Sequence, residues 1–160
     1  MIDYPNTLNV PEQLFTIVQV QDRTLPFTAY CALRAQLWQI DESENLAEAH
    51  DIVASPSWGV FVAQLSDNLP LGFVEAHLRD YAESAASSPV GYLEGWYVIP
   101  GHRRKGVGAA LVEAAERWAR SRGCIEMASD TTPENIVSFQ AHGRLGYREV
   151  ERLICFLKRL

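Results

Sequence analysis

The clearest candidate for chemistry is a basic, glycine-bearing turn in the middle of the chain. Residues 103–108 read Arg-Arg-Lys-Gly-Val-Gly, and apolar residues then recur at helical spacing as far as Trp118. The first turn of a helix presents unpaired N–H groups and the positive end of the helix dipole, which attract anions. Because Gly106 and Gly108 lack side chains, a phosphate could approach those groups closely. The pattern predicts a phosphate site; the alternative is an ordinary turn with solvated cations.

Three carboxylates are candidates for binding or deprotonating an amine. Asp130 follows an expected strand, and α/β sheets bind ligands at the carboxyl ends of strands. A capping or turn aspartate is the alternative. Glu94 lies inside an expected buried strand, where a carboxylate is costly unless it is paired or faces a wet cleft. Glu75 has the same cost one strand earlier, or else lies on a face exposed at the edge of the sheet.

Two aromatic side chains could stack on a sugar ring. Trp38 falls beside the apolar stripe of the first expected helix rather than in it, and Tyr81 follows an expected strand. Packing in the core or at its rim is the alternative for both residues.

The composition is that of a soluble globular domain, with 48% apolar and 21% charged residues. The formal charge of −6 argues against a nucleic-acid partner and fits an acidic cleft for a cationic substrate, although it equally fits a margin of solubility. No stretch is apolar enough to span a membrane or resembles a signal peptide. The cysteines, Cys31, Cys124 and Cys155, lack metal-ligand spacing, so we expect no metal and a reducing, cytoplasmic location.

Periodicity and turn residues predict a mixed α/β sheet in the order β-α-α-β-β-β-α-β-α-β-β. We expect a flexible tail at residues 1–13 and a single domain at residues 14–160. Thr24 is expected to cap the first helix, and Thr132 to cap the last one, which ends before Gly146. Residues 147–160 are expected to form two strands or one long bent strand. The other expected strands are residues 15–21, 58–65, 71–79, 91–99 and 124–129, and a second helix covers about residues 43–54.

The central stretch resembles a known motif. A strand ending in Val98-Ile99-Pro100, followed by Arg103-x-x-Gly106-x-Gly108 at a helix start, is similar to the acetyl-coenzyme A motif of the GNAT acetyltransferases. The three-glycine dinucleotide fingerprint and the Walker loop are both absent. Leu-Glu-Gly at residues 93–95 and Ala-Ser-Asp at residues 128–130 resemble one group of that family, the aminoglycoside 6′-N-acetyltransferases. The similarity covers roughly residues 25–160.

The resemblance implies where acetyl-coenzyme A, the co-substrate, would bind. The pantetheine arm would pair with the end of the central strand, and the pyrophosphate would lie on the N–H groups of the loop. Asn135 would hold the pantetheine or adenine end. The residues implied in coenzyme binding are Trp96, Tyr97, Val98, Arg103, Arg104, Lys105, Gly106, Val107, Gly108, Ala109 and Asn135.

The resemblance also implies the reaction, in which an amine attacks the thioester directly and the main-chain N–H of Val98 stabilises the oxyanion. Asp130 or Glu75 would accept the proton of the amine, directly or through water. The implied acceptor-binding residues are Trp38, Tyr81, Glu94, Asp130 and Glu151. Alternative acceptors are a polyamine or a protein N-terminus, and a non-catalytic acyl-coenzyme A sensor is the alternative outside enzymes.

One position departs from the family pattern. Many GNAT enzymes have a tyrosine in the last helix that protonates the leaving thiolate, and His142 stands at that position here. Either the imidazole or solvent could supply the proton, and a lone histidine is more often structural, so His142 receives no catalytic role.

The C-terminal stretch also predicts an assembly. An apolar strand at a sheet edge exposes unpaired backbone groups and invites a second chain. We therefore expect a homodimer with residues 147–160 at or across the interface and Glu151 close to the acceptor cleft of the partner. A strand that completes its own sheet in a monomer is the alternative.

Overall fold

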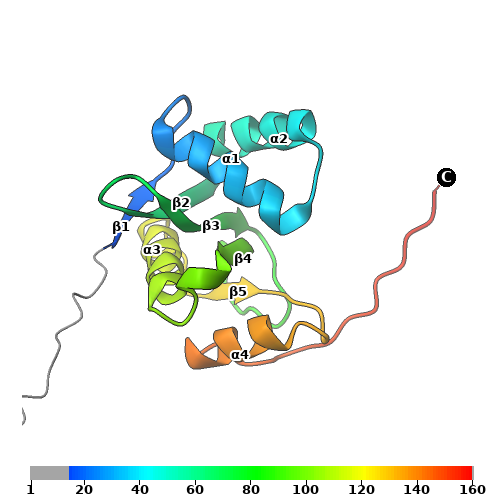
Figure 1. Ribbon diagram of the computed structural model, residues 1–160. Coiled ribbons are helices and arrows are strands. Elements are labelled where there is room, and N and C mark those ends of the chain that lie inside the picture. The colour runs from blue at the N-terminus through cyan, green and yellow to red at the C-terminus, as the bar shows by residue number, and fades with distance from the viewer. Residues whose placement is uncertain (1–14, 160) are drawn as a thin grey trace, which may run out of the picture.

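A five-stranded sheet forms the middle layer of the computed structural model, which describes residues 15–159 (Figure 1). The expected tail at residues 1–13 lies outside the described residues. Strands pair in the order β1-β2-β3-β4-β5, antiparallel except for the parallel pair of β4 and β5. The strands are β1 (Phe15–Gln19), β2 (Trp58–Leu65), β3 (Pro70–Arg79), β4 (Val90–Val98) and β5 (Met127–Ser129).

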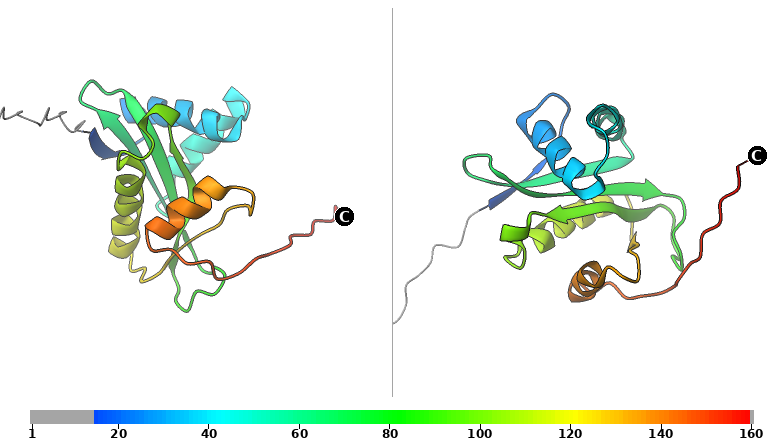
Figure 2. Two further views of the ribbon diagram at one scale, coloured as in Figure 1. Left: turned by 60° about the horizontal axis from the view of Figure 1, so that its bottom comes forward. Right: turned by 45° about the vertical axis from the view of Figure 1, so that its right-hand side comes forward.

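Helices cover both faces of the sheet (Figure 2). One face carries α1 (Leu25–Trp38) and α2 (Glu42–Ala54), and the other carries α3 (Val107–Ser121) and α4 (Ile136–Arg144). Pro100 ends β4 as expected and begins a short 3₁₀ turn, η1 (Pro100–His102). The mixed α/β fold and the element order as far as α4 are therefore confirmed.

The core has one apolar cluster on each side of the sheet. The predicted stripe of α3 is buried, and Leu111, Ala115 and Trp118 pack in the same cluster as Val74 and Leu93. On the opposite side, Phe27, Tyr30 and Leu33 of α1 pack in a cluster with Phe73. Side chains of β2, β3 and β4 are thus packed against helices on both faces of the sheet.

The register between β3 and β4 is interrupted at one residue. Glu75 lies opposite Gly95, and Ala76 lies opposite Leu93, so Glu94 has no partner on β3. This bulge reverses the alternation of β4: Leu93 faces the α3 cluster, and beyond the bulge Trp96 does so as well.

The C-terminal part differs from the sequence prediction. Residues 147–159 form no helix or strand, so the two expected strands are wrong for this single chain, and β5 is shorter than expected. Asn135, not Thr132, caps α4, because its Oδ1 accepts a hydrogen bond from Ser138 N at 3.1 Å. Gly146 does follow the end of α4, in the left-handed conformation with φ 90°.

The helices of residues 15–159 are all too short or too polar to cross a membrane.

Candidate functional site

The basic turn leads into α3 as expected. Gly106 is the N-cap residue and has φ 82°, a conformation that favours glycine. The first bond of the helix runs from Ala110 N to Gly106 O, so the amides of residues 107–109 have no earlier carbonyl in the helix to pair with. Arg104 and Lys105 are exposed beside these amides. The local geometry therefore suits an anion.

Gly108 has a reason for lacking a side chain that the sequence did not reveal. A Cβ at this position would lie 2.9 Å from Cζ2 of Trp96, whose indole covers the first turn of α3. The indole N–H of Trp96 is buried and has no hydrogen-bond partner among the described residues. Packing against Trp96 thus explains Gly108 at least as directly as the approach of a phosphate.

The edge of β4 that faces β5 is open beyond the third pair. Pairing begins at Gly91 with Met127 and ends at Leu93 with Ser129, whereas β4 continues to Val98. This leaves backbone N–H and C=O groups along the second half of β4 for another extended chain.

Val98 contributes to this open edge. The N–H of the next residue, Ile99, bonds to Leu71 O on the β3 side at 2.9 Å, whereas Val98 O accepts from Arg103 Nε at 2.8 Å. Because both backbone groups of a residue in an antiparallel ladder point the same way, the N–H of Val98 faces the open edge. Arg103, whose guanidinium lies 5.7 Å from the ring centroid of Tyr97, folds back on the strand rather than extending with its neighbours.

His142 fastens α4 to the end of β5. Its Nδ1 lies 2.9 Å from Ser138 O and its Nε2 lies 3.0 Å from Ser129 Oγ. A carbonyl can only accept, so Nδ1 donates to Ser138 O, and Ser129 Oγ also lies 3.3 Å from Leu93 O. The ring also meets Trp96 edge to face at 5.5 Å. His142 therefore lies at the point where β4 and β5 part.

The predicted acceptor face, formed by Trp38, Glu94 and Asp130, lies on the opposite side of the sheet, at the end of α1. Trp38 is the last residue of this helix and is 38% exposed. Its ring covers Gly95, where any side chain would collide with it. The ring of Trp38, the predicted stacking surface, thus packs against β4 and remains partly exposed.

Glu75 lies beneath this face in a closed network. It is 2% exposed, and its Oε1 accepts from Arg34 Nε at 3.0 Å and from Tyr30 Oη. Burial raises the pKa of Glu75, with Tyr30 and Arg34 opposing the shift. Arg34 continues the network to Asn45 and Glu48 on α2. The exposed sheet edge considered from the sequence is therefore wrong for Glu75.

Glu94 is paired as well, with a residue that the sequence analysis did not single out. Arg79 donates from Nε to Oε1 at 2.7 Å and from Nη2 to Oε2 at 2.5 Å. The Nδ1 atom of His77 lies 3.3 Å from the same Oε1. Alternation along β3 places Glu75, His77 and Arg79 on one face, and this period of two was the signal that could have found both neighbours of Glu94.

Asp130 joins the same cluster from the end of β5. Its Oδ1 accepts from Tyr92 Oη at 2.8 Å, and burial, followed by this carboxylate, raises the pKa of Tyr92. The guanidinium of Arg79 lies 3.5 Å from the centroid of the Tyr92 ring. Tyr81, 68% exposed, lies in the segment between β3 and β4.

The structure thus brings together most of the predicted acceptor residues on one face, but not Glu151. Glu151 lies in the segment after α4, which extends away from the sheet in every view (Figure 2). Asn135 is near the start of α4, with its side-chain oxygen used as a cap.

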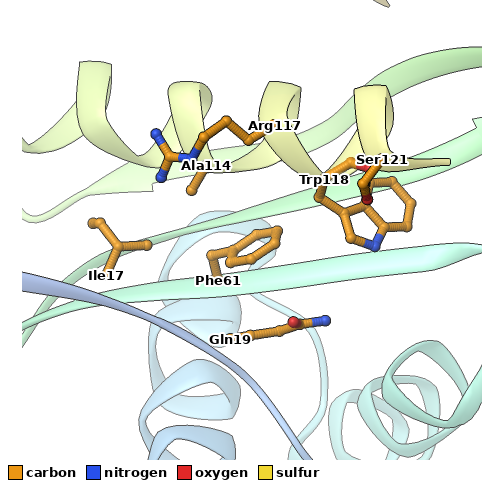
Figure 3. A pocket seen from close by; sticks show the side chains of 7 residues that line it. All are labelled: Ile17, Gln19, Phe61, Ala114, Arg117, Trp118 and Ser121. Carbon is orange, nitrogen blue, oxygen red and sulfur yellow. The ribbon is translucent and has the colours of Figure 1, made fainter. Parts of the chain in front are cut away.

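A separate pocket lies between α3 and the strands β1 and β2 (Figure 3). Trp118 contributes an indole N–H that is buried without a described partner, and Arg117 stands at the other end. None of the predicted site residues lines this pocket, so it is distinct from the coenzyme turn and the acceptor face. Its lining residues are Ile17, Gln19, Phe61, Ala114, Arg117, Trp118 and Ser121.

In this geometry β4 and β5 part beside a helix whose N-cap residue is a glycine. The comparison with known families agrees with it. Residues 20–147 match the model of the acetyltransferase (GNAT) family, so the chain belongs to this family. The predicted resemblance is confirmed.

Three similar proteins carry the name of one group within the family, the aminoglycoside 6′-N-acetyltransferases. An aminoglycoside N(6′)-acetyltransferase type 1 from Klebsiella aerogenes is 44% identical over 142 residues, which are 86% of this chain and 93% of the relative. The enzyme of the same name from Salmonella typhimurium is 42% identical, covering 79% of this chain and 88% of the relative. The solved structure of AAC(6′)-Iy with the bisubstrate analogue CoA-S-monomethyl-acetylneamine has a TM-score of 0.86 at 38% identity, covering 92% of this chain and 99% of that one.

Proposed function

We propose that this protein transfers the acetyl group of acetyl-coenzyme A to the 6′-amino group of aminoglycosides. The observation that carries the proposal is the open edge of β4, which lies between the α3 turn on one side and a face with Glu94 and Asp130 on the other. A thioester arm paired along this edge would meet an ammonium held by those carboxylates. The names of the relatives support the choice of acceptor. Conferring resistance to these antibiotics would follow from the reaction.

The reaction requires a neutral amine, an oxyanion donor and an acceptor for one proton. Bringing a lysine-like amine with a pKa of roughly 10.4 to its neutral form at pH 7 costs about 4–5 kcal/mol. Asp130 is exposed at the end of β5 and could take the proton directly, whereas buried Glu75 would need a water chain. The nearby carboxylates strengthen binding of the ammonium but oppose its deprotonation. The N–H of Val98 is the proposed oxyanion donor.

Release of free thiol from acetyl-coenzyme A tests the proposal. We expect release with an aminoglycoside that carries a 6′-amine, and much slower release with spermidine or a peptide N-terminus. A preference for either of those amines would replace the proposed acceptor, and no release with any amine would indicate a sensor of acyl-coenzyme A.

We also propose that the protein works as a homodimer. Residues 147–159 carry Phe156 at 92% and Leu157 at 101% exposure, and α4 has no buried residue. Apolar side chains exposed to this extent are unstable in water unless another surface covers them. The edge of β5 that does not face β4 is available for a strand from a second copy. Glu151 would then approach the acceptor face of the partner.

Light scattering at micromolar concentration tests the assembly, because a dimer would have about twice the monomer mass of 17.9 kDa. Truncation after Arg152 is expected to yield monomers. A truncated chain that stays dimeric and fully active would refute a role for this segment.

The cytoplasmic location remains a proposal that rests on three cysteines without a disulfide. Fractionation of cells that produce the protein would test it.

A further inference from the structure

Arg79 already occupies the carboxylate that an acceptor was expected to use. Its two parallel hydrogen bonds neutralise Glu94 before any amine arrives, and such fork-shaped pairs are among the strongest that arginine forms. The side chain of Glu94 is 18% exposed and that of Arg79 is 36% exposed. An incoming molecule therefore meets the guanidinium at least as readily as the carboxylate.

The guanidinium is also fixed in place. It stacks on Tyr92, whose hydroxyl is bonded to Asp130, so one cation is linked to both carboxylates of the acceptor face. A planar group held by two contacts loses little further freedom when it binds a ligand. Arg79 is thus a preformed element of the face rather than a mobile surface charge.

The remaining hydrogen-bonding capacity of Arg79 has a definite chemical preference. An arginine has five N–H donors, and the pair with Glu94 uses two of them. The other three can donate to a hydroxyl or ether oxygen but not to an ammonium, which the positive charge repels. The Nδ1 atom of His77 lies 3.3 Å from the same carboxylate, so the imidazole occupies space beside Glu94 that an incoming amine would otherwise use.

We propose that Arg79 selects the acceptor by favouring amines that carry sugar oxygens beside the ammonium and by disfavouring linear polyamines. This inference rests on the proposed function and extends it, because it assigns the choice between these two amine classes to one residue. The residue acts by attraction and by repulsion together, which is how specific sites separate similar ligands.

The experiment compares binding of neamine and spermidine by calorimetry in the presence of coenzyme A, which requires no turnover. In Arg79→Met we expect the preference for neamine over spermidine to fall by about tenfold or more, because Glu94 becomes available to any ammonium. In Arg79→Met combined with Glu94→Gln, the gain in spermidine binding should disappear. Arg117→Met is the matched control, since it removes an ion-paired arginine from the opposite side of the sheet.

An unchanged preference in Arg79→Met, or an equal change for both amines, would overturn the inference. If that variant does not fold, Arg79→Lys decides: neamine binding should weaken by about fivefold while spermidine binding stays within about twofold, because the charge remains and the fork is lost. Turnover of neamine by the unaltered protein is a separate readout. Its absence would refute the proposed function without bearing on the ratio of the two binding constants.

Discussion

The two sides of β4 differ in how completely their backbone groups are paired with a neighbouring strand. On the side of β3, antiparallel pairing runs from Val90 to Val98 with a bulge at Glu94, and the charges beneath it are paired within the chain, as between Glu75 and Arg34. On the side of β5, pairing stops after three residues, and the helix that follows buries none of its side chains. The first side is completed within one chain, whereas the second has unpaired backbone groups and exposed apolar side chains among the described residues.

The largest effect is expected on the closed side. Glu75→Ala would leave Arg34 and Tyr30 buried without their shared carboxylate, and such changes cost about 3–5 kcal/mol of unfolding free energy. Urea denaturation would measure the loss. Glu48→Ala is the control: its side chain is 49% exposed, so removing it should cost no more than about 1 kcal/mol. If Glu75→Ala cost no more than about 1 kcal/mol, as little as Glu48→Ala, the network around Glu75 would not stabilise the fold.

The next effect concerns the open side. If Phe156 is covered by a second copy, Phe156→Asp should weaken association by about 2 kcal/mol or more while leaving the unfolding of the monomer unchanged. Sedimentation over a range of concentrations would measure it. Phe156→Leu keeps the apolar surface and should remain dimeric. An equally stable dimer with aspartate would place the interface elsewhere.

The glycine-bearing turn before α3, proposed to bind the coenzyme, offers a test in which the two variants differ only in charge. Gly106 has φ 82°, and no atom lies within 4 Å of the point where a Cβ would stand, so aspartate and asparagine there carry the same backbone strain. Gly106→Asp should raise the KM for acetyl-coenzyme A about tenfold above that of Gly106→Asn, because a negative charge would face the phosphate. The KM for the amine should be alike in both. Equal KM values for the coenzyme would argue against an anion site.

The smallest effect is expected where the two sides are joined. Glu126, just before β5, accepts hydrogen bonds from Ser87 and Ala86 in the segment after β3, and these bonds, first that of the Ser87 hydroxyl, lower the pKa of Glu126. Its stabilisation is therefore present above the usual glutamate pKa of about 4.3 and is lost as the pH falls through the lower folded value.

Melting curves would check this. Glu126→Gln should melt below the unaltered protein at pH 7, and the difference should shrink as the pH falls below the usual glutamate pKa of about 4.3. A constant difference at every pH would mean that the charge of Glu126 is not involved.

The central helix and the turn before it were largely predictable from sequence, because they depend on residues that are close together in the chain. The apolar spacing of α3 and the turn at Pro100 are set by neighbouring residues, so both were placed correctly. The cap of α4 was misplaced because Thr132 and Asn135 both suit that role, and only tertiary contacts choose between them. Residues 147–159 have the alternation of a strand, but a strand needs an edge to pair with, and sequence cannot say which chain supplies it.

The positions of the candidate site residues could be predicted in part. The coenzyme turn and the carboxylates could be named from their types and positions, but the bond between Arg79 and Glu94 joins residues whose proximity depends on the register of two strands. The bulge at Glu94 changes that register by one residue, which no local pattern indicated.

The bulge also determines where the length of β4 can change without exchanging its two faces. Since Glu94 is the extra residue of β4, deleting it would leave Leu93 and Trp96 on the α3 face and Gly95 and Tyr97 on the α1 face, in an uninterrupted ladder with β3. A one-residue insertion or deletion elsewhere in β4, where no bulge absorbs it, would instead exchange the faces of every residue that follows. Alignment and redesign of this strand should treat residue 94 as an insertion that adds one carboxylate, paired with Arg79, without changing the faces of its neighbours.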